Sequence, residues 1–242
     1  MASTKKPKPA AAKPADPTAA LHAVLDSMKL PAIRAALEAG ANANILVADT
    51  PALTLALYRA KFDVAQALFD HGADVDFDDG AGTLLAGLCD NEGEKIPKPD
   101  ATAAMWLIKH GADCKRATRE SGRTPLADAA RSGHLELVNG LLGGGASLGP
   151  DKPTGNTPLH WAVASRADRM IWQRLLAAGN KLEAKNLAGE TPLSLAQAAF
   201  NHDAVAFLIE KGAKRDLTVG GKTPVERATA LKQTKIVKLL SR

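Results

Sequence analysis

The residues that could serve as nucleophiles, acids, bases or metal ligands lie far apart in this 242-residue sequence. Its six histidines are scattered, and its two cysteines, Cys89 and Cys114, belong to no Cys-x-x-Cys pair. Catalytic and metal sites need such groups to converge, and their usual motifs hold them at short fixed spacings. No phosphate-binding loop, Gly-x-Ser-x-Gly turn or His-Glu-x-x-His helix is present. The sequence therefore predicts a protein that is not an enzyme and has no cofactor and no metal site.

The cysteines and the apolar segments also indicate where the protein works. Two cysteines without disulfide-type spacing are typical of a reducing compartment. No segment approaches the roughly 18 apolar residues of a membrane-spanning helix. No apolar stretch follows the basic N-terminus, as it would in a secretory signal. We expect a cytoplasmic protein with no membrane span.

Basic charge is concentrated at the N-terminus. Residues 1–17 are rich in Lys, Pro and Ala and carry +3 of the formal net charge of +5. Such a segment has little apolar surface to bury, so a disordered tail is expected there. It could be a solubilising leader or an electrostatic arm for an acidic surface. The rest of the chain is close to neutral, which argues against nucleic acid as the main partner.

A Thr-Pro pair recurs along the rest of the chain. The pair, or a threonine alone in the second case, begins at Thr50, Thr83, Thr124, Thr157, Thr191 and Thr223. Successive threonines are 33, 41, 33, 34 and 32 residues apart. The second half of each unit carries a Leu-rich run that leads into a glycine, as in Leu208-Ile209-Glu210-Lys211-Gly212-Ala213. Self-similarity at a period of this size indicates a solenoid of stacked repeats.

The best-preserved unit reads Thr157-Pro158-Leu159-His160-Trp161-Ala162, which matches the Thr-Pro-Leu-His-x-Ala signature of ankyrin repeats. The chain therefore resembles the ankyrin repeat family over nearly all of its length outside the tail. The resemblance implies an all-α fold, a solenoid of about seven helix-loop-helix units joined by β-hairpin-type loops. We expect a tail at 1–17 and an ankyrin repeat domain at 18–242, with units near 18–49, 50–82, 83–122, 123–155, 156–189, 190–221 and 222–242.

Local signals predict where the helices of each unit start and stop. Thr157 can cap a first helix, and Pro158 suits its first position because the missing N–H has no partner there anyway. Glu226, three residues after Thr223, completes a capping box. Second helices should end at a glycine. They should bury an aliphatic ladder, such as Leu135, Val138, Leu141 and Leu142.

The resemblance also assigns roles to single polar residues. It gives His160 a structural role near the hairpin loop and places Cys89 at a core position. Cys114 follows a helix-ending Gly-Ala, where Lys115 and Arg116 could lower its pKa, so we expect it to be the more exposed and reactive thiol.

Two segments depart from the family pattern. About eight extra residues lie between the helices of the third unit, within Asp90–Pro99. This insertion could be a tolerated surface loop or a contact finger for a partner. In the fifth unit Gly179-Asn180 replaces Gly-Ala, which should shift the packing locally.

In proteins that this chain resembles, the residue between the structural His and the following Ala points onto a concave binding surface. The matching positions are Leu55, Gly87, Asp128, Trp161, Leu195 and Arg227. Trp161 stands out, because Trp, Tyr and Arg dominate the energetics of protein interfaces. The alternative is that Trp161 packs against a neighbouring helix. Trp106 and Trp172, on second helices, are expected to be packing residues.

Two successive hairpins differ sharply in charge. The acidic one carries Asp74, Asp76, Asp78 and Asp79 around Phe77, and the basic one carries Lys115, Arg116, Arg119 and Arg123. Such a split surface suits an electrostatically complementary protein and would repel part of any polyanion. Ordinary solvated loops would have a similar composition.

These observations together predict a non-catalytic module that binds a partner protein through the concave face and the hairpin tips, and that is monomeric when unbound. It could serve as a scaffold. A narrower hypothesis is an inhibitor or immunity protein that caps a toxic or hydrolytic enzyme. A third hypothesis is a binder of anionic surfaces or nucleic acid through the basic tail and the 115–123 loop.

Overall fold

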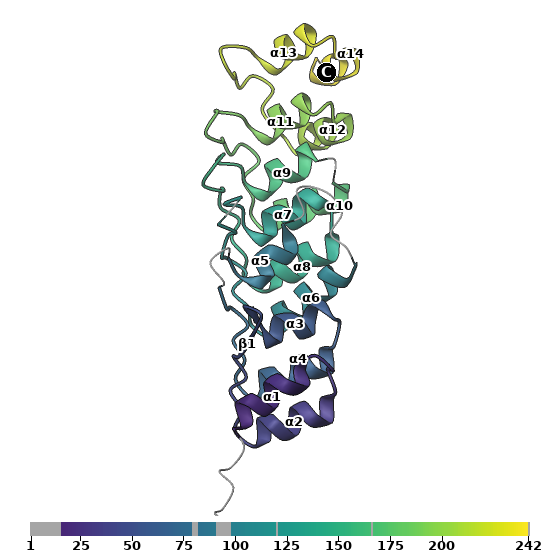
Figure 1. The fold of residues 1–242 in the computed structure, drawn as a ribbon. Coiled ribbons are helices and arrows are strands. Elements are labelled where there is room, and N and C mark those ends of the chain that lie inside the picture. The colour runs from purple at the N-terminus through teal and green to yellow at the C-terminus, as the bar shows by residue number, and fades with distance from the viewer. Residues whose placement is uncertain (1–15, 79–81, 91–97, 120, 166, 242) are drawn as a thin grey trace, which may run out of the picture. The chain divides into compact units, whose positions relative to one another are not determined.

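The computed structural model describes residues 16–78, 82–90, 98–119, 121–165 and 167–241 (Figure 1). The tail at 1–15, Asp79 and most of the expected insertion at 90–99 lie outside these residues.

Within the described residues the chain forms fourteen helices in seven consecutive pairs. The first helices of the pairs are α1 (Pro17–Leu25), α3 (Ala52–Tyr58), α5 (Leu84–Cys89), α7 (Pro125–Ser132), α9 (Pro158–Ala164), α11 (Pro192–Ala198) and α13 (Pro224–Ala230). The second helices are α2 (Leu30–Glu38), α4 (Phe62–Asp70), α6 (Lys98–Lys109), α8 (Leu135–Gly143), α10 (Arg169–Ala177), α12 (His202–Glu210) and α14 (Thr234–Leu240).

The links between the pairs are hairpin-like. The strands β1 (Leu46–Val47) and β2 (Thr50–Pro51) pair antiparallel, and single bridges join Asp78 to Thr83 and Val219 to Lys222. This arrangement confirms the predicted all-α fold of helix-loop-helix units joined by hairpin-type loops. None of the described helices is long and apolar enough to cross a membrane.

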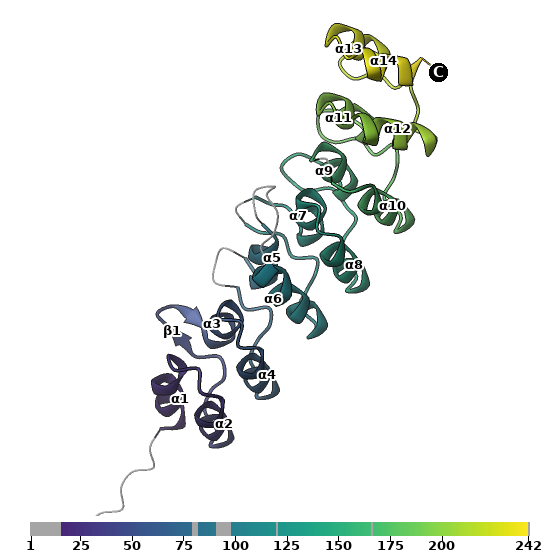
Figure 2. The same ribbon diagram turned by 90° about the vertical axis from the view of Figure 1, so that its right-hand side faces the viewer.

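The chain divides into two compact units, 1–74 and 75–242, and each is described by itself. In the first unit α1 packs on α2, α3 packs on α4, and α2 contacts α4. In the second unit each first helix contacts the next first helix, from α5 to α13, and each second helix contacts the next second helix, from α6 to α14. Figure 2 shows these two rows side by side through residues 75–242. We call them the first-helix row and the second-helix row.

Threonine caps start most of the first helices. The hydroxyls of Thr83, Thr124, Thr191 and Thr223 each accept a hydrogen bond from the backbone N–H three residues on. In turn, the side chain of Glu226 accepts a hydrogen bond from the backbone N–H of Thr223. This hydrogen bond also lowers the pKa of Glu226. Thr50 differs, because it belongs to β2 and pairs with Val47 in the hairpin, so α3 begins at Ala52 without a threonine cap.

The core of the second unit is aliphatic and tightly packed. Val138 and Leu141 of α8 are fully buried, as predicted, and Leu137 is buried with them. Leu135 and Leu142 were expected in the same ladder, yet both are partly exposed. The reason is that α8 turns Leu137, Val138 and Leu141 toward its neighbours, which is one helical face.

Buried amides tie neighbouring pairs together. Asn201 Nδ2 donates to the carbonyl of Val163 at 2.9 Å, and Gln197 Nε2 donates to the carbonyl of Pro224 at 2.8 Å. Gln233 Nε2 reaches back to the carbonyl of Gln197 at 2.8 Å. Because a buried polar group is costly unless it is paired, these bonds favour one stacking register between successive pairs.

Candidate functional site

Trp161 is the largest side chain on the first-helix row that remains partly exposed. It lies on α9, and its indole N–H donates to Asp151 Oδ2 at 2.7 Å. Asp151 is itself 5% exposed and accepts bonds from the backbone N–H groups of Thr154 and Gly155 at 2.8 and 3.1 Å. A carboxylate held by its own turn therefore fixes the orientation of the indole before any partner arrives.

Two guanidinium groups lie against the same indole ring. Arg123 is 5.6 Å and Arg131 is 5.5 Å from its centroid, within the range of cation–π attraction. Arg123 also bonds Asp128 through Nε at 2.6 Å and Asp90 through Nη2 at 2.7 Å. This side chain is 15% exposed, so three contacts hold it in one place. The result is a partly exposed cluster of one Trp and two Arg residues, which we call the Trp161 cluster.

Asp128 has a different place from the one that the resemblance implies. It was predicted to face a partner, but it is 3% exposed and lies under Arg123 on α7. Burial raises the pKa of this carboxyl to about 6, and the bond to Arg123 counteracts only part of that rise. Asp128 thus positions Arg123 instead of contacting the solvent itself.

Leu195 and Arg227 follow Trp161 along the first-helix row. They lie on α11 and α13, which contact α9 and α11 respectively, and both side chains are partly exposed. Arg227 pairs loosely with Glu190 at 3.7 Å, and among the described residues its Nη1 has no hydrogen-bond partner. The same Glu190 offers its backbone carbonyl to His160 Nε2 at 3.1 Å. Leu55, the matching residue in the unit 1–74, is partly exposed on α3.

His160 has the structural role that was predicted for it. Its Nδ1 accepts from the backbone N–H of Thr157 at 3.1 Å, so Nε2 carries the proton that is donated to Glu190. The ring is fully buried, and burial lowers its pKa. His160 therefore links α9 to the following hairpin as a neutral imidazole.

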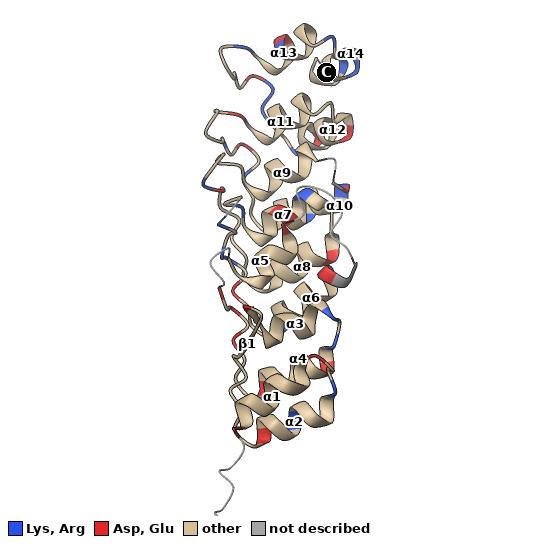
Figure 3. Cartoon of the chain, in the orientation of Figure 1, with Lys and Arg blue, Asp and Glu red and all other residues tan. Residues whose placement is uncertain are grey.

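The acidic and basic hairpins form ion pairs with each other, so they are not two separate charged surfaces. Arg116 and Arg119 bond the same carboxylate oxygen of Asp78 at 2.8 and 3.2 Å. Asp76 accepts from the backbone N–H of Asp113 at 2.8 Å. Figure 3 shows acidic and basic residues on neighbouring loops on this side of the stack. Part of the predicted split of charge is therefore neutralised by the pairing of Asp78 with Arg116 and Arg119.

The remaining hairpin residues that were predicted as contacts differ in how exposed their side chains are. Phe77 is partly exposed, and Lys115 is exposed. Asp74 is exposed at the end of the unit 1–74, and Asp79 lies outside the described residues.

Both cysteines are buried in this fold. Cys89 is fully buried, as predicted, and Cys114 is 2% exposed, which contradicts the expected exposed thiol. Burial raises the pKa of both thiols, and the carboxylate of Asp113 acts in the same direction on Cys114. Lys115 and Arg116 do not offset this effect, because the thiol packs inward against α8.

The other two tryptophans pack, as predicted. Trp172 is 3% exposed, donates to the carbonyl of Ala162 at 3.2 Å and lies 5.5 Å from the ring of Phe207. Trp106 stacks on His110 with ring centroids 3.7 Å apart.

The sequence did not point to Arg131 as a member of the Trp161 cluster, or to Asp151 and Asp90 as the carboxylates that hold the cluster. For Asp151 a signal exists, since Asp four residues before Gly is typical of a turn in which the carboxylate binds the following N–H groups. For Arg131 and Asp90 no local signal exists, because Arg131 lies on α7 and Asp90 follows α5, both far from Trp161 in the sequence.

Comparison with known proteins establishes the family. A family profile described as "Ankyrin repeats (3 copies)" matches residues 98–172 and 164–242, which is more than half of the chain. This protein belongs to the ankyrin repeat family, whose members are generally protein–protein interaction modules.

Relatives share parts of the chain. Rabankyrin-5 of Mus musculus is 34% identical over 156 residues, which is 60% of this chain and 13% of that protein. Ankyrin repeat and SOCS box protein 16 of Homo sapiens is 31% identical over 197 residues, which is 78% of this chain and 42% of that protein. The chain thus spans less than half the length of both relatives.

Solved structures share the fold. The ankyrin repeat domain of Bcl-3, described as a unique member of the IkappaB protein family, superposes with a TM-score of 0.73 at 22% identity. It covers 92% of this chain and 98% of its own. An ankyrin repeat domain from Acinetobacter baumannii superposes with a TM-score of 0.68 at 26% identity, over 78% of this chain and 95% of its own.

Proposed function

We propose that this chain is a non-catalytic module that binds a partner protein across the first-helix row, with the Trp161 cluster at the centre of the contact. The observation that carries the proposal is the geometry of Trp161. Its indole is held by Asp151 and flanked by two guanidinium groups, yet it stays partly exposed. A pre-oriented Trp beside Arg loses little side-chain entropy on binding, which is a property of interface hot spots.

The contact extends from this cluster in both directions in our proposal. Leu195 and Arg227 continue it along the row, and Arg123 adds an ordered edge. The flanking contact at the hairpin tips in our proposal is made by Phe77, Asp76, Asp78, Lys115, Arg116 and Arg119, and Asp79 is assigned to it from the sequence. Leu55, in the unit 1–74, is a separate proposed contact. An apolar segment with acidic flanks is the partner chemistry that Trp161, Leu195 and Arg227 favour together.

The test is affinity capture with quantitative mass spectrometry, using the full chain as bait. Trp161→Ala should lower the recovery of specific partners by at least about tenfold, because truncating a hot spot costs about 2 kcal/mol or more. Met170→Ala is the matched control, since it removes an exposed apolar side chain from the second-helix row and should change nothing.

The variant Asp151→Asn is a second test of the proposed contact around Trp161. It keeps the size of the side chain but weakens the bond to the indole, so an intermediate loss of recovery is expected. Melting curves by circular dichroism should show that the variants stay folded. Equal recovery by wild type and Trp161→Ala, with both proteins folded, would show that the contact lies elsewhere.

The narrower proposal of an enzyme inhibitor is distinguished by the captured partner. A cap for a toxic or hydrolytic enzyme would copurify in a 1:1 complex and abolish the activity of that enzyme at equimolar ratio. A scaffold would leave the activity of its partner unchanged.

A further inference from the structure

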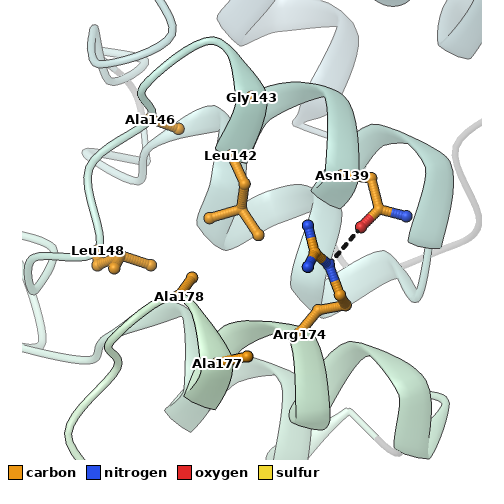
Figure 4. Close-up of a pocket in the computed structure, with 8 residues that line it drawn as sticks. All are labelled: Asn139, Leu142, Gly143, Ala146, Leu148, Arg174, Ala177 and Ala178. Carbon is orange, nitrogen blue, oxygen red and sulfur yellow. Dashed lines mark hydrogen bonds between the residues drawn. The ribbon is translucent and has the colours of Figure 1, made fainter.

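A groove opens between α8 and α10 on the second-helix row, away from the Trp161 cluster. Its volume is about 460 Å3, within the range of sites that hold small ligands or a few side chains. Figure 4 shows the side chains that surround it, with α8 on one side and α10 on the other. The groove is lined by Asn139, Leu142, Gly143, Ala146, Leu148, Arg174, Ala177 and Ala178.

The sequence explains why the groove is open at this place. In three units the two residues before the helix-ending glycine both carry long side chains, namely Asp70-His71, Lys109-His110 and Glu210-Lys211. The two adjacent units that form the groove carry Gly143-Gly144 and Ala177-Ala178 instead. Both walls therefore lack the side chains that would otherwise cover the space between the two helices.

The glycines at the end of α8 face two different surroundings, the preceding helix pair and the groove. A Cβ on Gly144 would lie 2.7 Å from Cys114 Sγ, and a Cβ on Gly140 would lie 2.7 Å from Met105 Sδ. These two glycines let α8 approach the preceding pair closely. A Cβ on Gly143 would meet nothing within 4 Å, so this position packs against nothing and leaves the groove empty.

One charged residue lines the groove. Arg174 is exposed on α10, and its Nε donates to Asn139 Oδ1 at 2.7 Å (Figure 4). This bond orients the guanidinium plane. Among the described residues, no hydrogen bond or ion pair engages its two terminal nitrogens. A guanidinium whose Nη1 and Nη2 are both free can pair end-on with the two oxygens of a carboxylate.

We propose that this groove docks a segment of a partner protein in which a Leu or Ile side chain stands next to an Asp or Glu. The aliphatic side chain fills the space beside Leu142 and Leu148, and the carboxylate pairs with Arg174. The groove is distinct from the first-helix surface, so the protein can engage two segments of a partner, or two partners, at once.

The probe is the dipeptide N-acetyl-Leu-Glu-amide, and its neutral match is N-acetyl-Leu-Gln-amide. Both are titrated into the 15N-labelled full chain, and amide shifts are followed by NMR. A ligand of this size should bind in the millimolar range. Shifts should be confined to Gly143, Leu148, Ala177, Ala178 and their neighbours, and the acidic peptide should bind at least about threefold more tightly.

Three variants make the test decisive. Arg174→Gln should bind both peptides equally, because only the charge pair distinguishes them. Gly143→Leu should weaken both at least about tenfold by filling the groove. Arg169→Gln is the matched control, since it removes an exposed arginine from the same helix outside the groove and should bind like wild type.

Absence of groove shifts at saturating peptide would overturn the proposal, as would a preference for the acidic peptide that persists in Arg174→Gln. Trp161→Ala should leave peptide binding unchanged. A negative peptide titration therefore leaves the proposed first-helix contact intact. A negative affinity-capture result with Trp161→Ala leaves the proposed groove site intact.

Discussion

Buried carboxylates organise the candidate surface at the scale of single residues. Asp151 binds the N–H groups of its own turn and the indole of Trp161, so one side chain sets the position of the aromatic ring of the cluster. Asp128 pairs with Nε of Arg123, and Asp90 pairs with Nη2 of the same side chain. The groups that a partner would meet in our proposal are thus held by carboxylates that are buried or largely buried.

Asp128 should make stability depend on pH below neutrality. Its pKa rises from an ordinary 3.8 to about 6 in the folded protein, mainly through burial. The folded state therefore binds the proton more tightly than the unfolded chain does. The stability that this provides is complete below about pH 4 and is lost as the pH rises to about 6.

Denaturation by urea between pH 4 and pH 7 tests this for wild type and Asp128→Asn. The difference in unfolding free energy, variant minus wild type, should increase from pH 4 to pH 6 by up to about 3 kcal/mol and then stay flat. A difference that does not change with pH would show that Asp128 titrates as an exposed acid does.

At the scale of elements, α8 shows how a helix can be fitted to its neighbours by glycine. Four glycines lie within residues 140–145, although glycine inside a helix costs about 1 kcal/mol relative to alanine. The close approach of α8 to Met105 and Cys114 accounts for two of them. Gly145 ends the helix at φ 77°, which accounts for the third.

Gly143 and Gly144 should therefore respond in opposite directions to the same substitution. Gly143→Ala should raise the unfolding free energy by up to about 1 kcal/mol, because it gains helix propensity and meets no neighbour. Gly144→Ala should lower it by about 1–3 kcal/mol, because the new methyl group clashes with the thiol of Cys114.

The measurement is urea denaturation of the two variants beside wild type. Cys114→Ala combined with Gly144→Ala should recover part of the loss, which a double-mutant cycle would show as coupling between the two positions. If both single variants are equally destabilised, the contrast between an open and a packed glycine is wrong.

At the scale of the whole molecule, net charge alone is a poor guide to the partner. The chain carries +5, and +3 of it belongs to residues 1–17. In the unit 75–242, Arg116 and Arg119 of the most basic loop form ion pairs with Asp78. Exposed pairs of this kind add little stability, but they reduce the positive field that a polyanion would meet.

Releasing these arginines should increase the affinity for a polyanion. Asp78→Asn should elute from a heparin column at a clearly higher salt concentration than wild type, because Arg116 and Arg119 become available to sulfate groups. Asp203→Asn is the matched control, since it removes the same charge from an exposed position on α12. Equal shifts for both variants would show that only net charge matters.

The sequence by itself determined the repeat, the helix pairs and the family. Those signals are local, because a threonine cap, a following proline and a closing glycine act within one helix and recur at each turn of the stack. The capping box at Thr223 followed from the same local rules. The structural role of His160 followed from the resemblance to the family, and the packing roles of Trp106 and Trp172 followed from their place on second helices.

Only the tertiary structure decided which side chains meet across units. The bond from Trp161 to Asp151, the pairing of Arg116 with Asp78, the burial of Asp128 and Cys114, and the empty position at Gly143 all depend on how successive pairs stack. The physical reason is that these contacts join residues on different elements, and their energies depend on burial and orientation that no local pattern encodes. The family follows from repetition along the chain, and the candidate surface follows from packing between its repeats.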